Sequence, residues 1–216
     1  MDANTIAWLI LLLPLASAAV ILIGTRRAAG VSALISTGSV IVTFVLAVIL
    51  LNLPEEAKAE PLSWLNLGKD LSVNIGLVFD ELARGMMIIV TGIGALVHLF
   101  SLGYMKDDEG KARYFAGLSL FMFSMTGIVL ADNFVMMFIF WELVGVSSYI
   151  LIGHWYNKDS AADAAKKAFL VNRIGDFGFL TGIFFIWISF GGLEFDNILH
   201  RPDRIGVIAA AMPDRM

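Results

Sequence analysis

Residues 134–152 read FVMMFIFWELVGVSSYILI, and this stretch decides the fold class. It is apolar apart from Glu142, two serines and a tyrosine. An α-helix needs about 20 mostly apolar residues to cross the hydrocarbon core of a bilayer. The stretch therefore predicts a transmembrane helix that carries one carboxylate near its middle.

The composition of the whole chain also indicates a membrane protein. Of its 216 residues, 58% are hydrophobic and 16% are charged, and the mean hydropathy is +0.81. Soluble domains are nearer to about 45–50% apolar and about 25% charged. The absence of cysteine excludes disulfide scaffolds and cysteine-ligated metal sites. The net charge of -4, without a basic run, excludes charge-driven binding of nucleic acid.

Six apolar runs are long enough to form transmembrane helices. They cover about residues 6–23, 31–53, 82–104, 114–130, 134–152 and 168–190. The first run lacks a basic region before it, and Arg26 and Arg27 follow it, so we interpret it as a retained helix rather than a signal peptide. The predicted fold class is an all-α polytopic membrane protein, with residues 191–216 beginning an external loop.

Basic residues in the connections predict the orientation, because Lys and Arg favour the cytoplasmic side of short loops. The connections after the first, third and fifth runs carry most of them, namely Arg26, Arg27, Lys106, Lys111, Arg113, Lys158, Lys166 and Lys167. The segment after the sixth run, with Arg201, Arg204 and Arg215, is the exception. We therefore expect the N-terminus to lie outside.

The long connection between the second and third runs contains a pattern of period two. Apolar residues alternate with polar or small ones at Leu71, Val73, Ile75, Leu77 and Phe79. This alternation is typical of a β-strand. Residues 67–70 could form a turn in front of it. We expect a short external β-hairpin that caps the helices.

Two shorter polar segments also carry structural signals. Asp132 and Asn133 separate the fourth and fifth runs, and we interpret them as a tight turn with an N-cap for the fifth helix. Residues 157–167 are polar and rich in alanine, and Asp159 or Ser160 could be an N-cap there. We expect this second segment to run along the cytoplasmic surface and to lead into the sixth helix at residue 168.

Glu142 is the first candidate functional residue. A carboxylate at the bilayer centre costs about 2.5–3.5 kcal/mol on insertion scales. Gly145, Ser147 and Ser148 follow it, and small residues let another helix approach closely. Two interpretations stay open: a structural glutamate that bonds a neighbouring helix, and a member of an ion or proton path, which intramembrane ionisable residues usually mark.

The sixth run carries a second group of charges. Lys166, Arg173 and Asp176 share one helical face, and Arg173 and Asp176 are spaced to pair with each other. Arg173 could instead extend its side chain to the membrane interface. His98, in the third run, can exchange a proton near neutral pH, although a lone histidine is more often a satisfied interior group. Spacing alone leaves a structural or a proton-relaying role open for these residues. We expect no metal site, because the three histidines are dispersed.

Several motifs, in this order and spacing, resemble the largest antiporter-like subunit (subunit L, or chain 5) of proton-pumping NADH:quinone oxidoreductase, respiratory complex I. They comprise residues 78–82, 94–105, 113–125, 130–134, 140–145, 148–149, 164–169 and 172–178. The elements Phe-Trp-Glu-Leu and Asp-Asn-Phe are shared across antiporter-like proteins. The run Asn-Arg-Ile-Gly-Asp-Phe-Gly at residues 172–178 is more specific to this subunit.

The resemblance implies roles for individual residues. Glu142 matches the glutamate of the proton path, which in the family couples to a lysine in a seventh helix. Arg173 and Asp176 match ionisable positions near the cytoplasmic proton input, and Lys166 matches the basic start of the sixth helix. His98 falls on a position typical of the family, and no role follows for it.

The resemblance also implies a function for the intact protein. It would be a proton-translocating subunit that couples quinone reduction to proton pumping, in an energy-conserving membrane, more naturally a bacterial inner membrane than an organelle. Its partners would be the lipid bilayer and other membrane subunits of the complex, with no nucleic acid or soluble substrate bound here. NAD, FMN, iron–sulfur clusters and quinone would be bound in other subunits of the complex, and this chain would carry no cofactor. The alternative is the large subunit of a multisubunit cation/proton antiporter.

The family's subunit has well over a dozen helices, so the resemblance implies that the 216 residues are an N-terminal portion. A fragment, a truncated product and one piece of a split gene are all open explanations. On its own, this portion is expected to be inactive.

Overall fold

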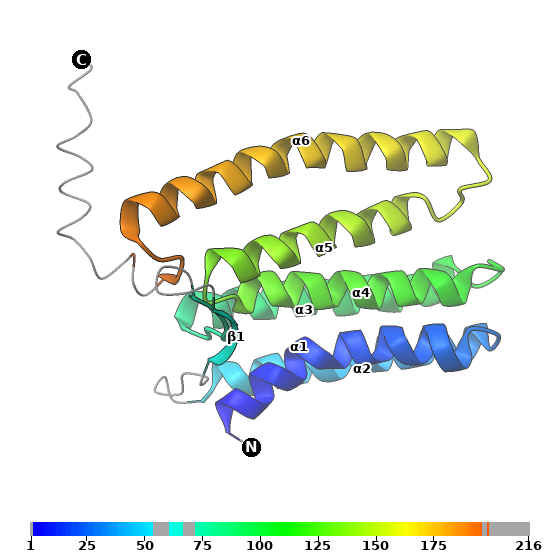
Figure 1. Ribbon diagram of the computed structural model, residues 1–216. Helices are drawn as coiled ribbons and strands as arrows, with labels where there is room; N and C mark the ends of the chain where they lie inside the picture. The colour runs from blue at the N-terminus through cyan, green and yellow to red at the C-terminus, as the bar shows by residue number, and fades with distance from the viewer. Residues whose placement is uncertain (1, 54–60, 67–71, 196–197, 199–216) are drawn as a thin grey trace, which may run out of the picture.

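The computed structural model describes residues 2–53, 61–66, 72–195 and 198, and these form an up-and-down bundle of helices (Figure 1). Six helices in this part of the chain are long and apolar enough to cross a membrane. They are α1 (Ala3–Val20), which continues as the π-helical segment η1 (Ile21–Thr25), α2 (Ala29–Leu51), α3 (Glu81–Tyr104), α4 (Lys111–Leu130), α5 (Phe134–Ile152) and α6 (Asp159–Phe190). The predicted six-helix membrane fold is therefore confirmed.

Consecutive helices run in opposite directions, so their connections gather at two ends of the bundle (Figure 1). The end that holds the α1–α2, α3–α4 and α5–α6 connections is called the basic end, because Arg26, Lys106 and Lys158 lie in these connections. The opposite end is called the hairpin end, and it holds the N-terminus, two β-strands and the α4–α5 connection.

A short hairpin is present between α2 and α3, as predicted. Strands β1 (Leu62–Asn66) and β2 (Ser72–Ile75) pair antiparallel, while the predicted turn at residues 67–70 lies outside the described residues. The second strand is shorter than the alternating pattern indicated, because it ends before Gly76. There the chain turns onto the α4–α5 connection, where Leu77 forms a bridge with Ala131 and the Val78 N–H donates to the Leu130 carbonyl at 2.9 Å.

The α4–α5 connection is a tight polar break, also as predicted. Asn133 is the N-cap of α5, and its side-chain oxygen accepts a hydrogen bond from the Met136 N–H at 2.8 Å. The side-chain amide of Asn133 donates to the carbonyl of Asn74 at 2.8 Å and to the carboxylate of Asp132 at 2.6 Å. This break therefore joins two transmembrane helices to the hairpin.

Asp132 in this break predicts a pH dependence of stability. Burial raises the pKa of the Asp132 carboxyl above its ordinary value, despite hydrogen bonds from Asn133 and Gly76, and Glu194 adds to the rise. The folded chain therefore holds this proton more tightly than the unfolded chain. Wild-type stability should fall as the pH rises from the ordinary aspartate pKa, about 3.9, through the raised pKa in the folded state.

In Asp132→Asn, the free energy of unfolding should no longer decrease over this pH range, because asparagine does not titrate. Equilibrium unfolding measured at several pH values in the range would detect the difference. Asp107→Asn, an exposed position at the basic end, is the control and should keep the wild-type pH dependence. A pH dependence that is unchanged in Asp132→Asn would refute the assignment.

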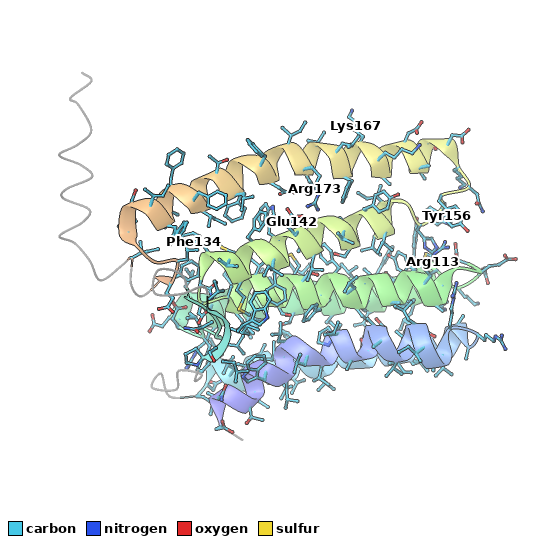
Figure 2. The ribbon with its side chains drawn as sticks, viewed as in Figure 1. Arg113, Phe134, Glu142, Tyr156, Lys167 and Arg173 are labelled. Carbon is cyan, nitrogen blue, oxygen red and sulfur yellow. The ribbon has the colours of Figure 1, made fainter. Side chains whose placement is uncertain are left out.

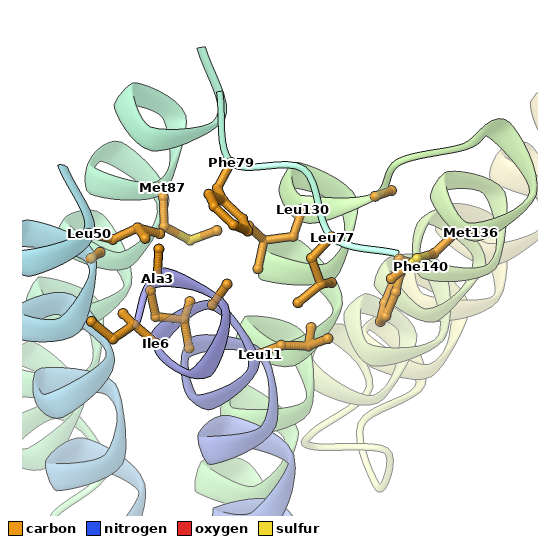
Figure 3. Packing of buried hydrophobic residues seen from close by; sticks show 14 residues of the cluster. Ala3, Ile6, Leu11, Leu50, Leu77, Phe79, Met87, Leu130, Met136 and Phe140 are labelled. Atoms are coloured by element: carbon orange, nitrogen blue, oxygen red, sulfur yellow. The ribbon is translucent and has the colours of Figure 1, made fainter. Parts of the chain in front are cut away.

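A hydrophobic core lies at the hairpin end (Figure 3). Ile6 and Ile10 of α1, Met87 of α3 and Leu130 of α4 are almost fully buried there. Leu77 and Phe79, from the segment between β2 and α3, insert among the helix ends (Figure 3). The connection thus closes this end of the bundle, where α4 ends and α5 begins.

Helix α6 begins earlier than predicted. It starts at Asp159, so residues 159–167 are its first turns rather than a separate surface segment. The alanines and lysines there are good helix formers, and hydropathy marks the hydrocarbon span rather than the full length of a helix. The N-cap prediction was also wrong, because the N-cap is Lys158, which makes no side-chain capping bond. Among the described elements, α6 packs mainly against α5.

Asp108 joins two connections at the basic end. Its Oδ1 accepts a hydrogen bond from the Gly110 N–H at 2.7 Å and lies 3.1 Å from Nε2 of His154, while Oδ2 accepts one from the Trp155 indole at 2.7 Å. Burial alone would raise the pKa of the Asp108 carboxyl, but the hydrogen bonds from Trp155, His154 and Gly110 outweigh it and hold the pKa below its ordinary value. The α3–α4 connection is thereby held against the chain that leaves α5.

Candidate functional site

An ion pair between Glu142 of α5 and Arg173 of α6 forms the centre of the candidate site. Nη1 of Arg173 contacts Oε2 of Glu142. Both side chains lie between the two helices, and each is partly buried (Figure 2). Glu142 therefore contacts a second helix through a partner that carries a positive charge.

Asp176 is the second carboxylate in this site. Its Oδ2 lies 3.5 Å from Nη1 of Arg173, the i, i+3 contact that the spacing predicted. Its Oδ1 accepts a hydrogen bond from the indole N–H of Trp141 at 3.0 Å. Arg173 thus lies between two carboxylates. Helix α5 contacts both members of the Arg173–Asp176 pair, Arg173 through Glu142 and Asp176 through Trp141. We call Trp141, Glu142, Arg173 and Asp176 the charged cluster.

Two further residues make room for Arg173 and orient it. A Cβ atom added to Gly145 would lie 3.1 Å from Nη2 of Arg173, so the missing side chain at this position allows the guanidinium to reach α5. The guanidinium carbon lies 4.5 Å from the centre of the Phe169 ring, a cation–π contact one helical turn earlier on α6. The small-residue face that was predicted next to Glu142 therefore receives a charged side chain.

Lys166 and His98 lie apart from the charged cluster. The Lys166 side chain is two-thirds exposed, and its ammonium pairs with Asp163 at 3.3 Å. His98 is buried on α3, where its Nδ1 lies 2.7 Å from the Gly94 carbonyl oxygen and its ring faces that of Phe115 on α4. Of the five residues predicted from the sequence, three meet between α5 and α6.

Sequence reasoning missed the contact between Glu142 and Arg173 for an identifiable reason. A helix start at residue 168 placed Arg173 near the membrane interface. Helix α6 begins at Asp159, which puts Arg173 about 21 Å along its axis, and the contact with Glu142 shows that the two residues lie at the same level of the bundle. Trp141 and Phe169 were also missed, although Phe169 stands four residues before Arg173, the spacing at which helical side chains meet.

Comparison with known proteins places the chain in a family. Residues 64–115 match the family model described as NADH-ubiquinone oxidoreductase (complex I), chain 5 N-terminus. Residues 131–210 match the model described as NADH:quinone oxidoreductase/Mrp antiporter, TM. The chain belongs to the antiporter-like subunit family of complex I. The sequence resemblance is confirmed by these two matches, which include every residue of the charged cluster.

Several antiporter-like subunits are similar over nearly the whole chain. NADH-quinone oxidoreductase subunit L of Mycobacterium tuberculosis is 39% identical over 198 residues, 88% of this chain and 31% of that protein. NAD(P)H-quinone oxidoreductase chain 5 of Synechocystis is 38% identical over 220 residues, 96% of this chain and 32% of that protein. The chain therefore spans about a third of the length of these relatives.

A solved structure supports the same membrane fold. A chain in the structure of the Mrp complex from Dietzia sp. matches with a TM-score of 0.75 and 25% identity, over 94% of this chain and 22% of that one. The arrangement of the six helices is thus that of an antiporter-like membrane subunit, and the chain is a multi-pass membrane protein.

Proposed function

We propose that this chain is the N-terminal membrane part of a proton-translocating subunit of a NADH:quinone oxidoreductase. The observation that carries the proposal is the charged cluster, in which two carboxylates and a guanidinium meet between two membrane-spanning helices. Each charge at the bilayer centre costs about 2.5–3.5 kcal/mol on insertion scales, and such residues usually mark ion or proton paths. The family membership supports the same function.

In the proposed mechanism, Glu142 is the residue that takes and gives up the proton. Its carboxylate shares the Arg173 guanidinium with Asp176, and Trp141 holds the far oxygen of Asp176 in place. A proton on Glu142 removes its negative charge, so the attraction of Arg173 to Asp176 then dominates. Loss of that proton returns Arg173 to Glu142. Protonation is thereby converted into a displacement of one partly buried cation.

Quinone reduction elsewhere in the complex would drive these charge changes. NAD, FMN, iron–sulfur clusters and quinone would be bound by other subunits of the complex, and other membrane subunits would be the direct partners of this chain. Lys166 would supply positive charge at the basic end, and His98 would be a separate protonatable position in the α3–α4 region. The basic end would face the cytoplasm of a bacterial cell, because Lys and Arg favour the cytoplasmic side of short loops.

The experiment that tests the proposal is Glu142→Gln in a full-length subunit assembled into the membrane complex. We expect NADH-driven proton uptake by inverted membrane vesicles to fall strongly while the complex still assembles, because glutamine is isosteric with glutamate but carries no titrating proton. Glu109→Gln, an exposed acidic position in the α3–α4 connection, is the control. Normal proton uptake by an assembled Glu142→Gln enzyme would exclude the proposed role.

A second candidate is a subunit of a cation/proton antiporter, which the similarity to the Mrp complex favours. The two functions differ in the energy source for proton transport, which is quinone reduction in the first and a cation gradient in the second. Sodium/proton exchange in membranes that do not oxidise NADH would indicate the antiporter. The higher identity to quinone oxidoreductase subunits, 38–39% against 25%, is why the redox-driven function is proposed first.

A further inference from the structure

Two adjoining cavities lie beside α5 and α6 at the basic end. The first has a volume of about 260 Å³, and its wall includes Arg113 of α4, Lys166 of α6 and the tyrosines Tyr149 and Tyr156. The second has a volume of about 400 Å³, and Tyr149 and Lys166 line it as well, together with Phe169 and Leu170. The first cavity, which has the polar groups, therefore adjoins the second, which forms an apolar groove along α6.

Arg113 is held in position to offer its guanidinium to this first cavity. It donates one hydrogen bond to the His154 carbonyl at 2.7 Å, and its guanidinium carbon lies 4.9 Å from the centre of the Tyr156 ring (Figure 2). Asp108 holds His154 in turn, through the contact at 3.1 Å. A guanidinium has five N–H donors, so the bond to His154 leaves donors that can meet an anionic oxygen.

Lys166 supplies the second positive charge. Its pair with Asp163 joins two side chains that are 67% and 75% exposed, and surface pairs of this kind contribute about 0–1 kcal/mol. The ammonium can therefore leave Asp163 for a better-placed anion. Lys167, the next residue on the same helix, points away from α5 and does not line either cavity (Figure 2).

The position of the cavities indicates the chemistry of the ligand. They lie where the polar beginning of α6 meets its apolar length, which is the level of a lipid headgroup in a bilayer. Leu170 is 63% exposed beside them and presents an apolar surface at the depth of acyl chains. Basic pockets between transmembrane helices bind anionic lipid headgroups, whereas a free phosphate would make no use of the apolar groove.

We propose that these cavities bind an anionic phospholipid. Its phosphodiester lies between Arg113 and Lys166, and one acyl chain runs along Phe169 and Leu170. This site contains no residue of the charged cluster, although Phe169 lies between them and contacts Arg173. The proposal does not depend on the proposed proton translocation. The lipid would fill the space between α5 and α6 at the basic end and hold the start of α6 in place.

Native mass spectrometry of the purified 216-residue chain tests the proposal. The chain, in detergent, is mixed with phosphatidylglycerol or with phosphatidylcholine of the same acyl chains. We expect preferential retention of phosphatidylglycerol. Each basic side chain near the headgroup should contribute about fivefold in affinity, so Lys166→Gln should lose about that factor and the Arg113→Gln, Lys166→Gln double variant more.

A control variant at Lys167 and competition by inorganic phosphate distinguish an anionic-lipid site from the alternatives. Lys167→Gln removes the same charge from the neighbouring residue and should keep the wild-type preference. Because the Lys166 side chain is exposed, Lys166→Gln should fold normally, which near-ultraviolet circular dichroism checks. Equal retention of both lipids by the wild type, or an equal loss in Lys166→Gln and Lys167→Gln, overturns the proposal. Displacement of the lipid by inorganic phosphate would also overturn it, in favour of a free-anion site.

Discussion

Arg173→Gln is expected to lower the free energy of unfolding by about 3 kcal/mol, the lower end of the range for breaking a buried ion pair. The substitution leaves Glu142 and Asp176 as two carboxylates without their shared cation between membrane-spanning helices. The lower end applies because the Arg173 and Glu142 side chains are 30% and 25% exposed. Equilibrium unfolding in mixed micelles of a mild detergent and dodecyl sulfate would measure the change.

A double-mutant cycle separates the ion pair from simple loss of packing. Glu142→Gln with Arg173→Gln removes both charges and should recover much of the stability that Arg173→Gln loses, because no uncompensated carboxylate then remains at position 142. Lys167→Gln, on the exposed face of α6, should change stability little. If Glu142→Gln and Arg173→Gln are additive in the cycle, the two residues do not form the pair that the structure shows.

Gly127→Ala is expected to destabilise the chain by about 1–3 kcal/mol, the usual cost of overpacking a well-packed site. Gly127 lies on α4 where α5 crosses it, and a Cβ atom there would collide with the Phe140 ring. Phe140 is buried and packs edge to face on Phe123 at 5.2 Å between ring centres, so it cannot simply move aside. The same unfolding measurement applies.

Gly38→Ala in α2 is the matched control, with an expected change of opposite sign. Among the described residues, nothing outside the adjoining residues and nearby backbone of α2 itself lies within 4 Å of a Cβ at Gly38. Alanine in a helix interior is favoured over glycine by about 0.5–1 kcal/mol, so this variant should be slightly more stable than the wild type. Changes of the same sign and size at both positions would mean that the α4–α5 contact at Gly127 is not the cause.

The number of spans and the local signals were predictable because they depend on short stretches of sequence. Each span follows from the transfer of one apolar run into hydrocarbon, which needs no knowledge of the neighbouring helices. The N-cap at Asn133 and the hairpin between α2 and α3 likewise arise from residues close in sequence. The orientation of the bundle in the membrane stays a prediction, as do the roles of Glu142, Asp176, Arg173, Lys166 and His98.

The beginning of α6 was not predictable from hydropathy, and the error carried through to the site. The polar residues 159–167 continue the helix beyond the apolar span, and the contact with Glu142 places Arg173 at the level of that carboxylate rather than at the membrane interface. Glu142 and Asp176 were identified as charges in the membrane without a structure, because an ionisable residue in an apolar run is visible in the sequence itself.

The stretch FVMMFIFWELVGVSSYILI by itself determined a membrane helix with a carboxylate in its middle. Only the tertiary structure decided that Arg173 forms an ion pair with that carboxylate and that Trp141 donates a hydrogen bond to Asp176. It also decided that Gly145 leaves the space for the guanidinium. Insertion free energy adds up residue by residue along one helix. An ion pair between helices depends on their relative depth and rotation, which the packing of α5 against α6 alone sets.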